Sequence, residues 1–487
     1  MNYEHTETLA PLAPAANQLR KGALGAGAVT FFVISAAAPL VAIAGGAPLG
    51  MLLGNGAGMP GAYLITVLIL LLFAVGYCAL ARHVTNAGAF YAFAARGLGG
   101  MAGGASSMIA LIGYNTMQIG LYGMFGAAAQ GLFQQAGINL PWWAYSYIAM
   151  ASIAVLGYRQ VDLSAKVLTL LVAAEYLCVL VLDVAIIAKG GDSGLSAAPF
   201  APSHVFSGAP SIGLVFAFAC FVGFEATTIY GEEAKDPKRT IPKATYFSVL
   251  LIGGFYMLSS WCLVNAEGLG KLASYLGGLP DPTRFLFNMA DRYVGHWLSV
   301  VMSVLFVTSV YAGLLAFHNS VARYFFAMGR EGLLPEHFGK THDKHQSPHT
   351  GSVAQTIIAG IVVGIFVVTK QDPVLALFSW LTNVGTLGVI TLMAIASFAV
   401  PAFFVRNPHM SDGIFSSYVA PIGAGILLVI VLYNIVINFA LLTGASNVLS
   451  YSLTGLILAA AVIGLALALR LRGADAARYA SIGHEKI

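Results

Sequence analysis

The sequence predicts an all-α membrane protein with twelve transmembrane helices, and its composition carries that prediction. Of its 487 residues, 58% are hydrophobic and 9% are charged, and the mean hydropathy is +0.81. A soluble domain carries about 25% charged residues, so a soluble globule of this composition would lack the polar residues that cover a surface. Many apolar runs approach the ~20 residues that a helix needs to cross a bilayer. Outer-membrane barrels are excluded because their strands are shorter and alternate in polarity.

The twelve predicted spans alternate with polar loops along the whole chain. Because their number is even, both ends of the chain are expected on the same side of the membrane. When that side is the cytoplasm, all but five of the 24 Lys and Arg residues fall on cytoplasmic segments or helix ends, as the positive-inside rule requires. The five exceptions are Lys189, Lys271, Arg284, Arg292 and Lys370. The predicted spans lie near 23–52, 60–81, 104–133, 142–158, 165–189, 211–231, 244–266, 297–326, 352–369, 374–404, 418–442 and 448–470.

Two of these spans are interrupted at membrane depth. In the first span Pro39 has no N–H, so the carbonyl of Ser35 is expected to lose its helical partner. In the sixth span Gly223 stands beside the acidic Glu225, and an unpaired carboxylate in hydrocarbon is costly. The breaks lie five helices apart, which favours two inverted five-helix repeats with discontinuous helices 1 and 6 around a midplane site. That arrangement is typical of a transporter and argues against a channel.

The predicted repeats, the added spans and the two tails make five parts of the chain. These are a cytoplasmic N-terminal tail (1–22), a first repeat (23–190), a second repeat (211–404), two extra spans (418–470) and a cytoplasmic C-terminal tail (471–487). The polar start of the chain does not fit a cleaved signal peptide. The short tails leave no room for a signalling domain, so we do not expect a sensor or receptor.

Backbone groups freed by the breaks must find partners, and they predict a receptor for a zwitterion. The second half of a broken helix offers N–H groups and the positive end of its dipole, which suit a carboxylate. The first half ends in free carbonyls, which suit an ammonium group or a cation. The expected donors are Ala37 and Ala38, and the expected carbonyls are those of Ile34, Ala219 and Val222.

Several side chains near the breaks are further candidates. Asn115 and Gln118 share a face of the third span and could border the pocket. Thr308 and Ser309 lie at mid-depth in the eighth span and could supply hydroxyl ligands. For each of these, a hydrogen bond between helices is the alternative. Three residues flank the second break, where they either contribute to the site or only pack: Cys220, Phe221 and Phe224.

Other chemistry is not indicated. The four cysteines lie in apolar runs and are interpreted as free thiols. Four histidines in the 327–351 loop lack an acidic or thiolate cluster, so we expect no metal site. No nucleophile elbow, P-loop or zinc-protease motif is present, which argues against an enzyme or a cofactor. Topology explains the basic residues near the membrane, so no nucleic-acid partner is expected.

Three segments resemble the amino acid–polyamine–organocation (APC) superfamily, in its amino acid permease branch. They are FVGFEATTIYGEEAKDPKRTIPKA at 221–244, NSVARYFFAMGREGLLPEHFGKTHDKHQSPH at 319–349 and VISAAAPL at 33–40. The resemblance covers almost the whole chain and implies the five-plus-five fold. It also implies secondary transport of amino acids or related amines, with substrate backbone groups held at the breaks. Two departures stand out: the Ala-Pro run at 36–39 replaces a Gly-rich run, and Ala219 stands where some members have an aromatic gate.

A third departure concerns coupling. Glu175 lies nine residues after Lys166, where several proton-coupled relatives have a lysine, near the place where sodium-coupled relatives hold an ion. A carboxylate there could exchange a proton, help hold Na⁺, meet a substrate amine or simply bond to a hydroxyl or water. Glu225 could accept backbone N–H bonds at the break or titrate.

The leading hypothesis is a proton-coupled amino acid importer that works by alternating access in the inner membrane of a cell. Protons are preferred to Na⁺ as the coupling ion. The alternatives are a permease for polyamines or other organic amines, favoured by Glu175 and Glu225, and an amino acid exchanger. The sequence leaves open whether the protein is a monomer or a homodimer.

Overall fold

The computed structural model describes residues 19, 22, 24–159 and 165–484, and the regular secondary structure of this part of the chain is helical apart from an isolated parallel bridge between Leu24 and Ala234. The predicted N-terminal tail, 1–22, therefore lies almost wholly outside the described residues. The long helices are α4 (Met59–Ala81), α6 (Gly100–Gln134), α7 (Trp142–Arg159), α8 (Ala165–Lys189), α11 (Pro237–Glu267), α14 (His296–Glu331), α15 (His349–Val368), α16 (Ser379–Arg406), α17 (Ala420–Ile437) and α19 (Asn447–Ala474).

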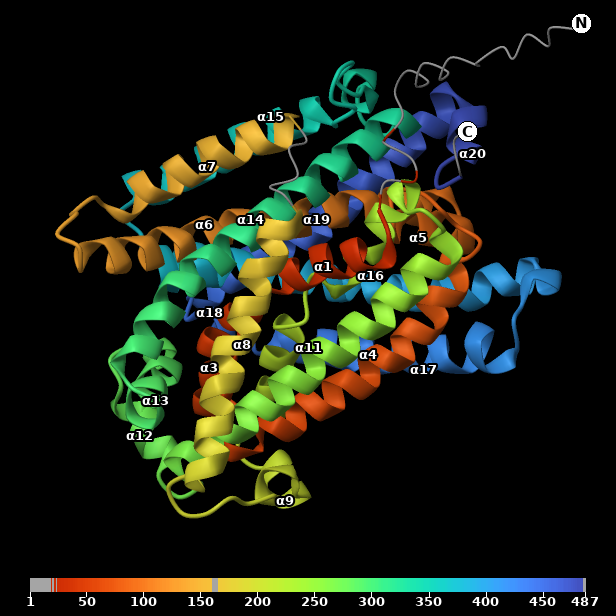
Figure 1. Ribbon diagram of the computed structural model, residues 1–487. Helices are drawn as coiled ribbons and strands as arrows, with labels where there is room; N and C mark the ends of the chain where they lie inside the picture. The colour runs from red at the N-terminus through yellow and green to blue at the C-terminus, as the bar shows by residue number, and fades with distance from the viewer. Residues whose placement is uncertain (1–18, 20–21, 23, 160–164, 485–487) are drawn as a thin grey trace, which may run out of the picture.

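Shorter helices complete the broken spans and the loops (Figure 1). The first span is α1 (Ala26–Ala37), α2 (Pro39–Val41), a π turn (Ala42–Gly46) and α3 (Ala47–Leu53), and the sixth is α10 (Pro210–Ala219) with a 3-10 segment (Phe224–Glu233). The loop helices are α5 (Phe90–Leu98), α9 (Pro202–Val205), α12 (Leu272–Gly278), α13 (Phe285–Tyr293), α18 (Phe439–Thr443) and α20 (Ala476–Ala480). Further short 3-10 and π turns are Gly56–Gly58, Ala198–Phe200, Pro282–Arg284, Glu336–Gly339, Pro373–Phe378, Pro408–Met410 and Phe415–Val419.

Ten stretches of the described chain are long and apolar enough to cross a membrane. They coincide with ten of the predicted spans, the first, the second and the fifth to twelfth. The predicted spans 104–133 and 142–158 form helices α6 and α7 but are not among the ten. Polar residues such as Asn115 and Gln118 lower the hydropathy of the first, and tryptophans, tyrosines, serines and Arg159 lower that of the second. The all-helical membrane fold is confirmed, whereas the count of twelve spans stays a prediction.

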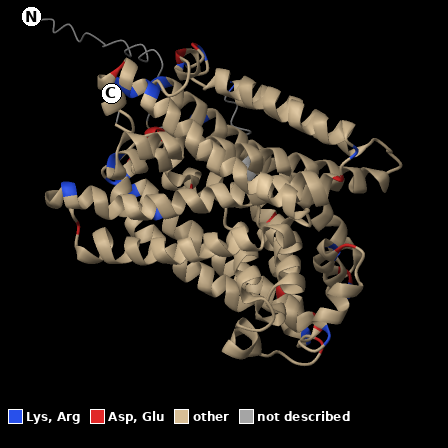
Figure 2. Cartoon of the chain, turned by 180° about the vertical axis from the view of Figure 1, so that it is seen from behind, with Lys and Arg blue, Asp and Glu red and all other residues tan. Residues whose placement is uncertain are grey.

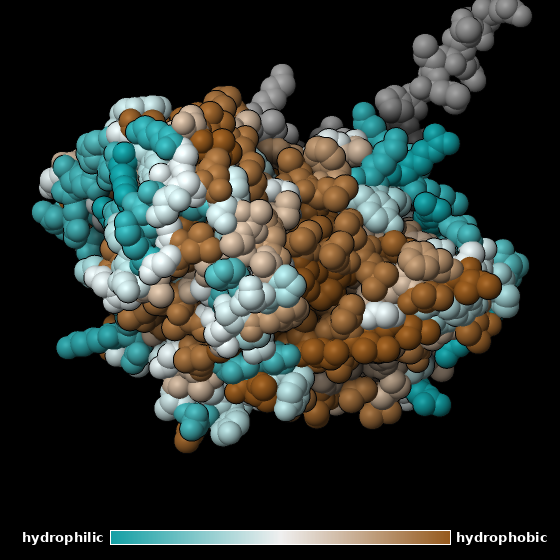
Figure 3. Space-filling model, turned by 90° about the horizontal axis from the view of Figure 1, so that it is seen from below, coloured by the Kyte–Doolittle hydropathy of each residue, from teal (hydrophilic) through white to brown (hydrophobic). Residues whose placement is uncertain are grey.

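The outer surface matches a lipid environment. Large apolar side chains such as Ile361 in α15, Ile430 in α17 and Leu458 in α19 are exposed, and Figure 3 shows a broad hydrophobic area bordered by hydrophilic patches. Figure 2 shows the charged residues gathered mainly toward the ends of the molecule, with few between them. An apolar surface of this extent is stable only against lipid, so this is an integral membrane protein.

Helix α6 packs against α14, α16 and α19. The approach to α19 is close: a Cβ on Gly104 would lie 2.5 Å from the Ala468 Cβ. Small residues bring membrane helices into contact that larger side chains would prevent. The broken spans pack against other helices, α1 against α11 and α14, and α10 against α3 and α4.

One end of the molecule, here called the terminal face, joins Leu24 to the last described residues. Leu24 exchanges two backbone hydrogen bonds with the 233–235 segment (2.9 and 2.8 Å). Residues 471–474 continue α19, and the short helix α20 follows it. The Asn86 side chain donates to the His484 carbonyl at 2.9 Å, which holds the end of the described chain against the helices. The described part of the predicted C-terminal tail is thus folded against the helices, because its backbone and the buried Ile482 find partners there.

A buried ion pair closes the terminal face. Arg323 in α14 donates to both carboxylate oxygens of Glu233 at 2.8 and 3.0 Å, and both side chains are less than 10% exposed. The guanidinium also lies over the Tyr230 ring, 4.8 Å from its centroid. These contacts tie the segment after the second break to α14.

Candidate functional site

The first helix breaks where the sequence predicts. Helix α1 ends at Ala37, Ala38 has a left-handed backbone (φ 43°), and Pro39 begins α2. The turn tightens, so the Ala38 N–H donates to the Ser35 carbonyl at 3.2 Å. The Ser35 carbonyl is therefore not left without a partner, and the Ala38 N–H is not the free donor that the sequence predicts.

The second break lies in the 220–223 turn, and the two breaks touch. Helix α10 ends at Ala219, and Gly223 has φ 115°, a conformation that favours glycine. A Cβ on Gly223 would lie 2.9 Å from the Ala36 Cβ and 3.3 Å from the Ala37 nitrogen. Gly223 thus permits both the turn and the contact between the broken spans.

Glu225 braces the second break. Its carboxylate accepts the Gly223 N–H at 2.9 Å on one oxygen and the Tyr114 hydroxyl at 2.6 Å on the other. The Tyr77 hydroxyl donates to the Glu225 carbonyl at 2.8 Å. With both oxygens bonded and the side chain fully buried, the contacts favour the structural alternative that the sequence left open for this residue.

Glu175 lies beside the first break. It is 1% exposed, and one oxygen accepts a 2.7 Å hydrogen bond from the Ser309 hydroxyl in α14. The other oxygen, Oε1, has no hydrogen-bond partner among the described residues. Thr308 instead bonds within its own helix, to the Leu305 carbonyl at 3.0 Å.

A central cavity of about 580 Å³ adjoins both breaks. Five of the predicted site residues line it: Ala37, Ala38, Ala219, Cys220 and Val222. Its wall on α6 is formed by Met117, Leu121 and Met124, and Phe216 and Phe317 line it as well. The cavity reaches the exposed loop residues Gln371 and Asp372, on the side away from the Arg323–Glu233 pair. The cavity therefore extends to exposed residues at this end.

The remaining predicted residues do not line this cavity. Gln118 lies 3.3 Å from His318 Nδ1 and accepts a hydrogen bond from Gln355, so it belongs to a buried polar network. Phe221 packs edge-on against Tyr256, and Phe224 packs edge-on against Phe73. Three further predicted residues are buried elsewhere: Ile34, Asn115 and Ser309. Gln118 and Ser309 thus make the hydrogen bonds between helices that were the alternative, and Phe221 and Phe224 pack, whereas Asn115 Oδ1 has no partner among the described residues.

Two groups of residues at the site escaped the sequence-based reasoning. Met117, Leu121 and Met124 recur at helical spacing on one face of α6, but α6 has no polar face, so this spacing does not distinguish a cavity wall from a helix contact. Tyr256 in α11 donates toward both breaks, at 3.3 Å to the Ala37 carbonyl and 3.1 Å to the Cys220 carbonyl. No local pattern marks this tyrosine, because only the crossing of distant helices brings it there.

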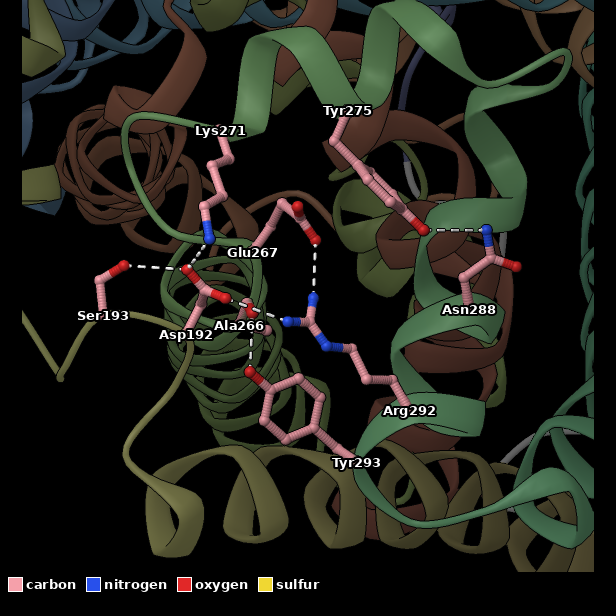
Figure 4. A network of polar contacts seen from close by, with 9 residues as sticks. All are labelled: Asp192, Ser193, Ala266, Glu267, Lys271, Tyr275, Asn288, Arg292 and Tyr293. Carbon is pink, nitrogen blue, oxygen red and sulfur yellow. Dashed lines mark hydrogen bonds and ion pairs between the residues drawn. The ribbon is translucent and has the colours of Figure 1, made fainter.

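The region around α12 and α13 is held by ion pairs (Figure 4). Asp192 accepts from Lys271 at 2.7 Å and from Arg292 at 3.0 Å, and Arg292 also reaches Glu267 at 3.0 Å. Hydrogen bonding to Lys271 is the main cause that holds the pKa of Asp192 below its usual range. This network fixes the α12–α13 region, whose Thr283 lines the cavity.

Comparison with known proteins decides the family. A family model for amino acid permeases matches residues 24–468. The chain belongs to the amino acid permease family. The permease is 24% identical over 371 residues to a branched-chain amino acid permease of Bacillus subtilis, covering 70% of this chain and 73% of that protein. It is also 24% identical over 366 residues to a low-affinity putrescine importer of Escherichia coli, covering 72% and 74%.

The fold of the permease recurs in solved structures. A manganese transporter of Eremococcus coleocola superposes with a TM-score of 0.54 at 14% identity, covering 95% of this chain and 99% of that one. At this identity the likeness concerns the fold alone. The family and these relatives are transporters, so the permease is a membrane transporter, as the sequence predicts.

Proposed function

We propose that the permease imports amino acids with apolar side chains, as a secondary active transporter that works by alternating access. The observation that carries this proposal is the composition of the central cavity. Around the two breaks its wall consists of small and apolar residues, whereas Glu175 and Glu225 are bonded elsewhere and do not line it. An apolar side chain gains by leaving water in such a cavity.

An organic amine without a carboxylate is the second candidate substrate, and it is supported by the similarity of the chain to a putrescine importer. A diamine needs counter-charges, because a buried cation without a partner is costly. The acidic residue that lines the cavity in the described chain is Asp372, at the exposed end, where it accepts the N–H groups of Val374 and Leu375. The apolar wall and the likeness to a branched-chain amino acid permease favour the amino acid.

The proposed cycle uses the two repeats, 23–190 and 211–404, as the moving parts, with 418–470 as added spans. The protein lies in the cell's inner membrane with both termini in the cytoplasm. In this orientation the cavity faces outward, and the Arg323–Glu233 pair keeps the cytoplasmic side closed. The backbone at the breaks would hold the ammonium and carboxylate groups. The apolar wall formed by Met117, Leu121 and Met124 would hold the side chain.

The substrate class can be tested by thermal stabilisation of the detergent-purified permease. A ligand that binds the folded state raises the melting temperature according to its occupancy. We expect L-leucine, L-isoleucine and L-valine to stabilise, and 3-methylbutylamine, the amine that corresponds to leucine, and putrescine to have no effect. Stabilisation by the amines without the amino acids would discard the proposal and make the permease an amine carrier.

Glu175 is proposed as the proton-coupling residue, because its unbonded Oε1 can take up a proton beside the first break. The Glu175→Gln variant keeps a hydrogen bond to Ser309 but cannot exchange a proton. We expect this variant to accumulate at least about tenfold less leucine than the wild type when a pH gradient drives uptake into proteoliposomes. Leucine counterflow, which needs no proton gradient, should persist. The matched control is Asp183→Asn, eight residues further along α8, where the buried carboxyl also has one oxygen bonded to a serine, Ser259 in α11, and one without a partner among the described residues. Because it does not lie beside the first break, this variant should keep coupling. Gradient-driven accumulation by Glu175→Gln would disprove the assignment, and counterflow without accumulation by the wild type would indicate an exchanger.

A further inference from the structure

A single buried hydroxyl links the two breaks. Tyr256, in the middle of α11, is fully buried, and its hydroxyl oxygen lies 3.3 Å from the Ala37 carbonyl and 3.1 Å from the Cys220 carbonyl. Ala37 is the last residue of α1, and Cys220 directly follows α10. The hydroxyl therefore contacts the carbonyl end of each interrupted helix.

The geometry indicates one hydrogen shared between two acceptors. O–H···O bonds usually measure about 2.7–2.8 Å, and a tyrosine hydroxyl has one hydrogen to donate. Both distances are longer than that, as expected when the hydrogen points between two carbonyls. Each carbonyl oxygen has two lone pairs, so each keeps the capacity to accept a second hydrogen bond.

The ring is held rigidly. Its centroid lies 5.4 Å from that of Tyr63 in α4 and 5.4 Å from that of Phe221, which meets it edge-on. Tyr256 does not line the cavity, whereas Ala37 and Cys220 do. Any effect of the hydroxyl on a bound molecule must therefore pass through these two carbonyls.

We propose that Tyr256 is a positioning residue that orients the Ala37 and Cys220 carbonyls toward the ammonium group of the transported amino acid. This inference rests on the proposed function. Without the hydroxyl, the two carbonyls lose their common donor and can turn apart, so a ligand must reorder them on binding. Preorganised groups bind more tightly because that ordering is already complete before the ligand arrives.

The test compares two variants that each lose a hydroxyl bonded to a backbone carbonyl. Tyr256→Phe keeps the ring and its packing. Tyr293→Phe is the matched control, because the Tyr293 hydroxyl donates to the Ala266 carbonyl at 2.7 Å, near the end of the same helix α11 and away from the breaks (Figure 4). The full-length protein is purified and its affinity for tritiated L-leucine measured, together with the melting temperature and the kinetics of leucine counterflow.

We expect Tyr256→Phe to weaken leucine binding about tenfold, the factor that one hydrogen bond of ordinary strength supplies. The KM of counterflow should rise in proportion, with kcat nearly unchanged. Tyr293→Phe should lower the melting temperature to a similar extent but leave the leucine affinity within about twofold of the wild type.

The outcomes separate this inference from the proposed function. If the wild type binds leucine and both variants bind it equally well, or equally poorly, Tyr256 has a structural role only and the inference is overturned. If Tyr256→Phe reduces kcat and leaves KM unchanged, the positioning role is also excluded. If the wild type binds no leucine while remaining folded, the proposed function fails and this inference fails with it.

Discussion

Replacement of Gly223 by alanine is expected to abolish leucine uptake. At this position the backbone has φ 115°, and the added Cβ would lie 2.9 Å from the Ala36 Cβ and 3.1 Å from the Ala36 carbonyl carbon. The strained backbone alone costs about 1–3 kcal/mol, and the overlap falls on the backbone of the first break, which cannot move without opening the crossing. We therefore expect uptake in proteoliposomes to fall to background, and the melting temperature to drop.

The control for this experiment is Gly254→Ala. Gly254 lies on the exposed side of α11, and nothing lies within 4 Å of the position that its Cβ would take. Alanine is the better helix former, so this variant should be as active and as stable as the wild type. Adding Ala36→Gly to Gly223→Ala removes the overlap between the two Cβ atoms and should restore part of the stability. Uptake by Gly223→Ala within twofold of the wild type would show that the breaks need not touch.

Removal of the Arg323 side chain is expected to cause the largest loss of stability. Arg323 and Glu233 form a bidentate pair that is almost fully buried. Breaking a buried pair by removing one partner costs about 3–5 kcal/mol, because the remaining charge stays in a region of low polarity. In Arg323→Ala the terminal face should also open more often, since the pair joins the segment after the second break to α14. Denaturation in detergent and labelling of Leu24→Cys with a membrane-impermeant thiol reagent measure the two effects.

An exposed ion pair provides the comparison. Arg82 and Asp412 approach to 2.7 Å, but their side chains are 46% and 45% exposed. Surface pairs of this kind contribute about 0–1 kcal/mol, so Arg82→Ala should scarcely change the stability. The double variant Glu233→Gln with Arg323→Gln removes both charges and should recover part of the loss. Equal stability of Arg323→Ala and Arg82→Ala would contradict a closing role for the buried pair.

The helix breaks illustrate what local chemistry predicts well. Proline lacks an N–H and glycine tolerates a positive φ, so Pro39 and Gly223 mark interruptions wherever the surrounding chain folds. The interruptions lie at these residues. By contrast, the direction in which Gln118, Phe221 or Phe224 points was not predictable. These residues lie on segments that are apolar on all sides, and such segments carry no periodic signal that distinguishes a cavity wall from a helix contact.

The sequence by itself determined the membrane class, the helical fold and the positions of the two breaks, because these follow from hydropathy and from the covalent chemistry of proline and glycine. The tertiary structure alone decided the partners: Glu225 with Tyr114, Glu175 with Ser309, and Tyr256 with both breaks. Each of these contacts joins residues that are far apart in the chain. Their pairing depends on how whole helices cross, and no short stretch of sequence encodes a crossing.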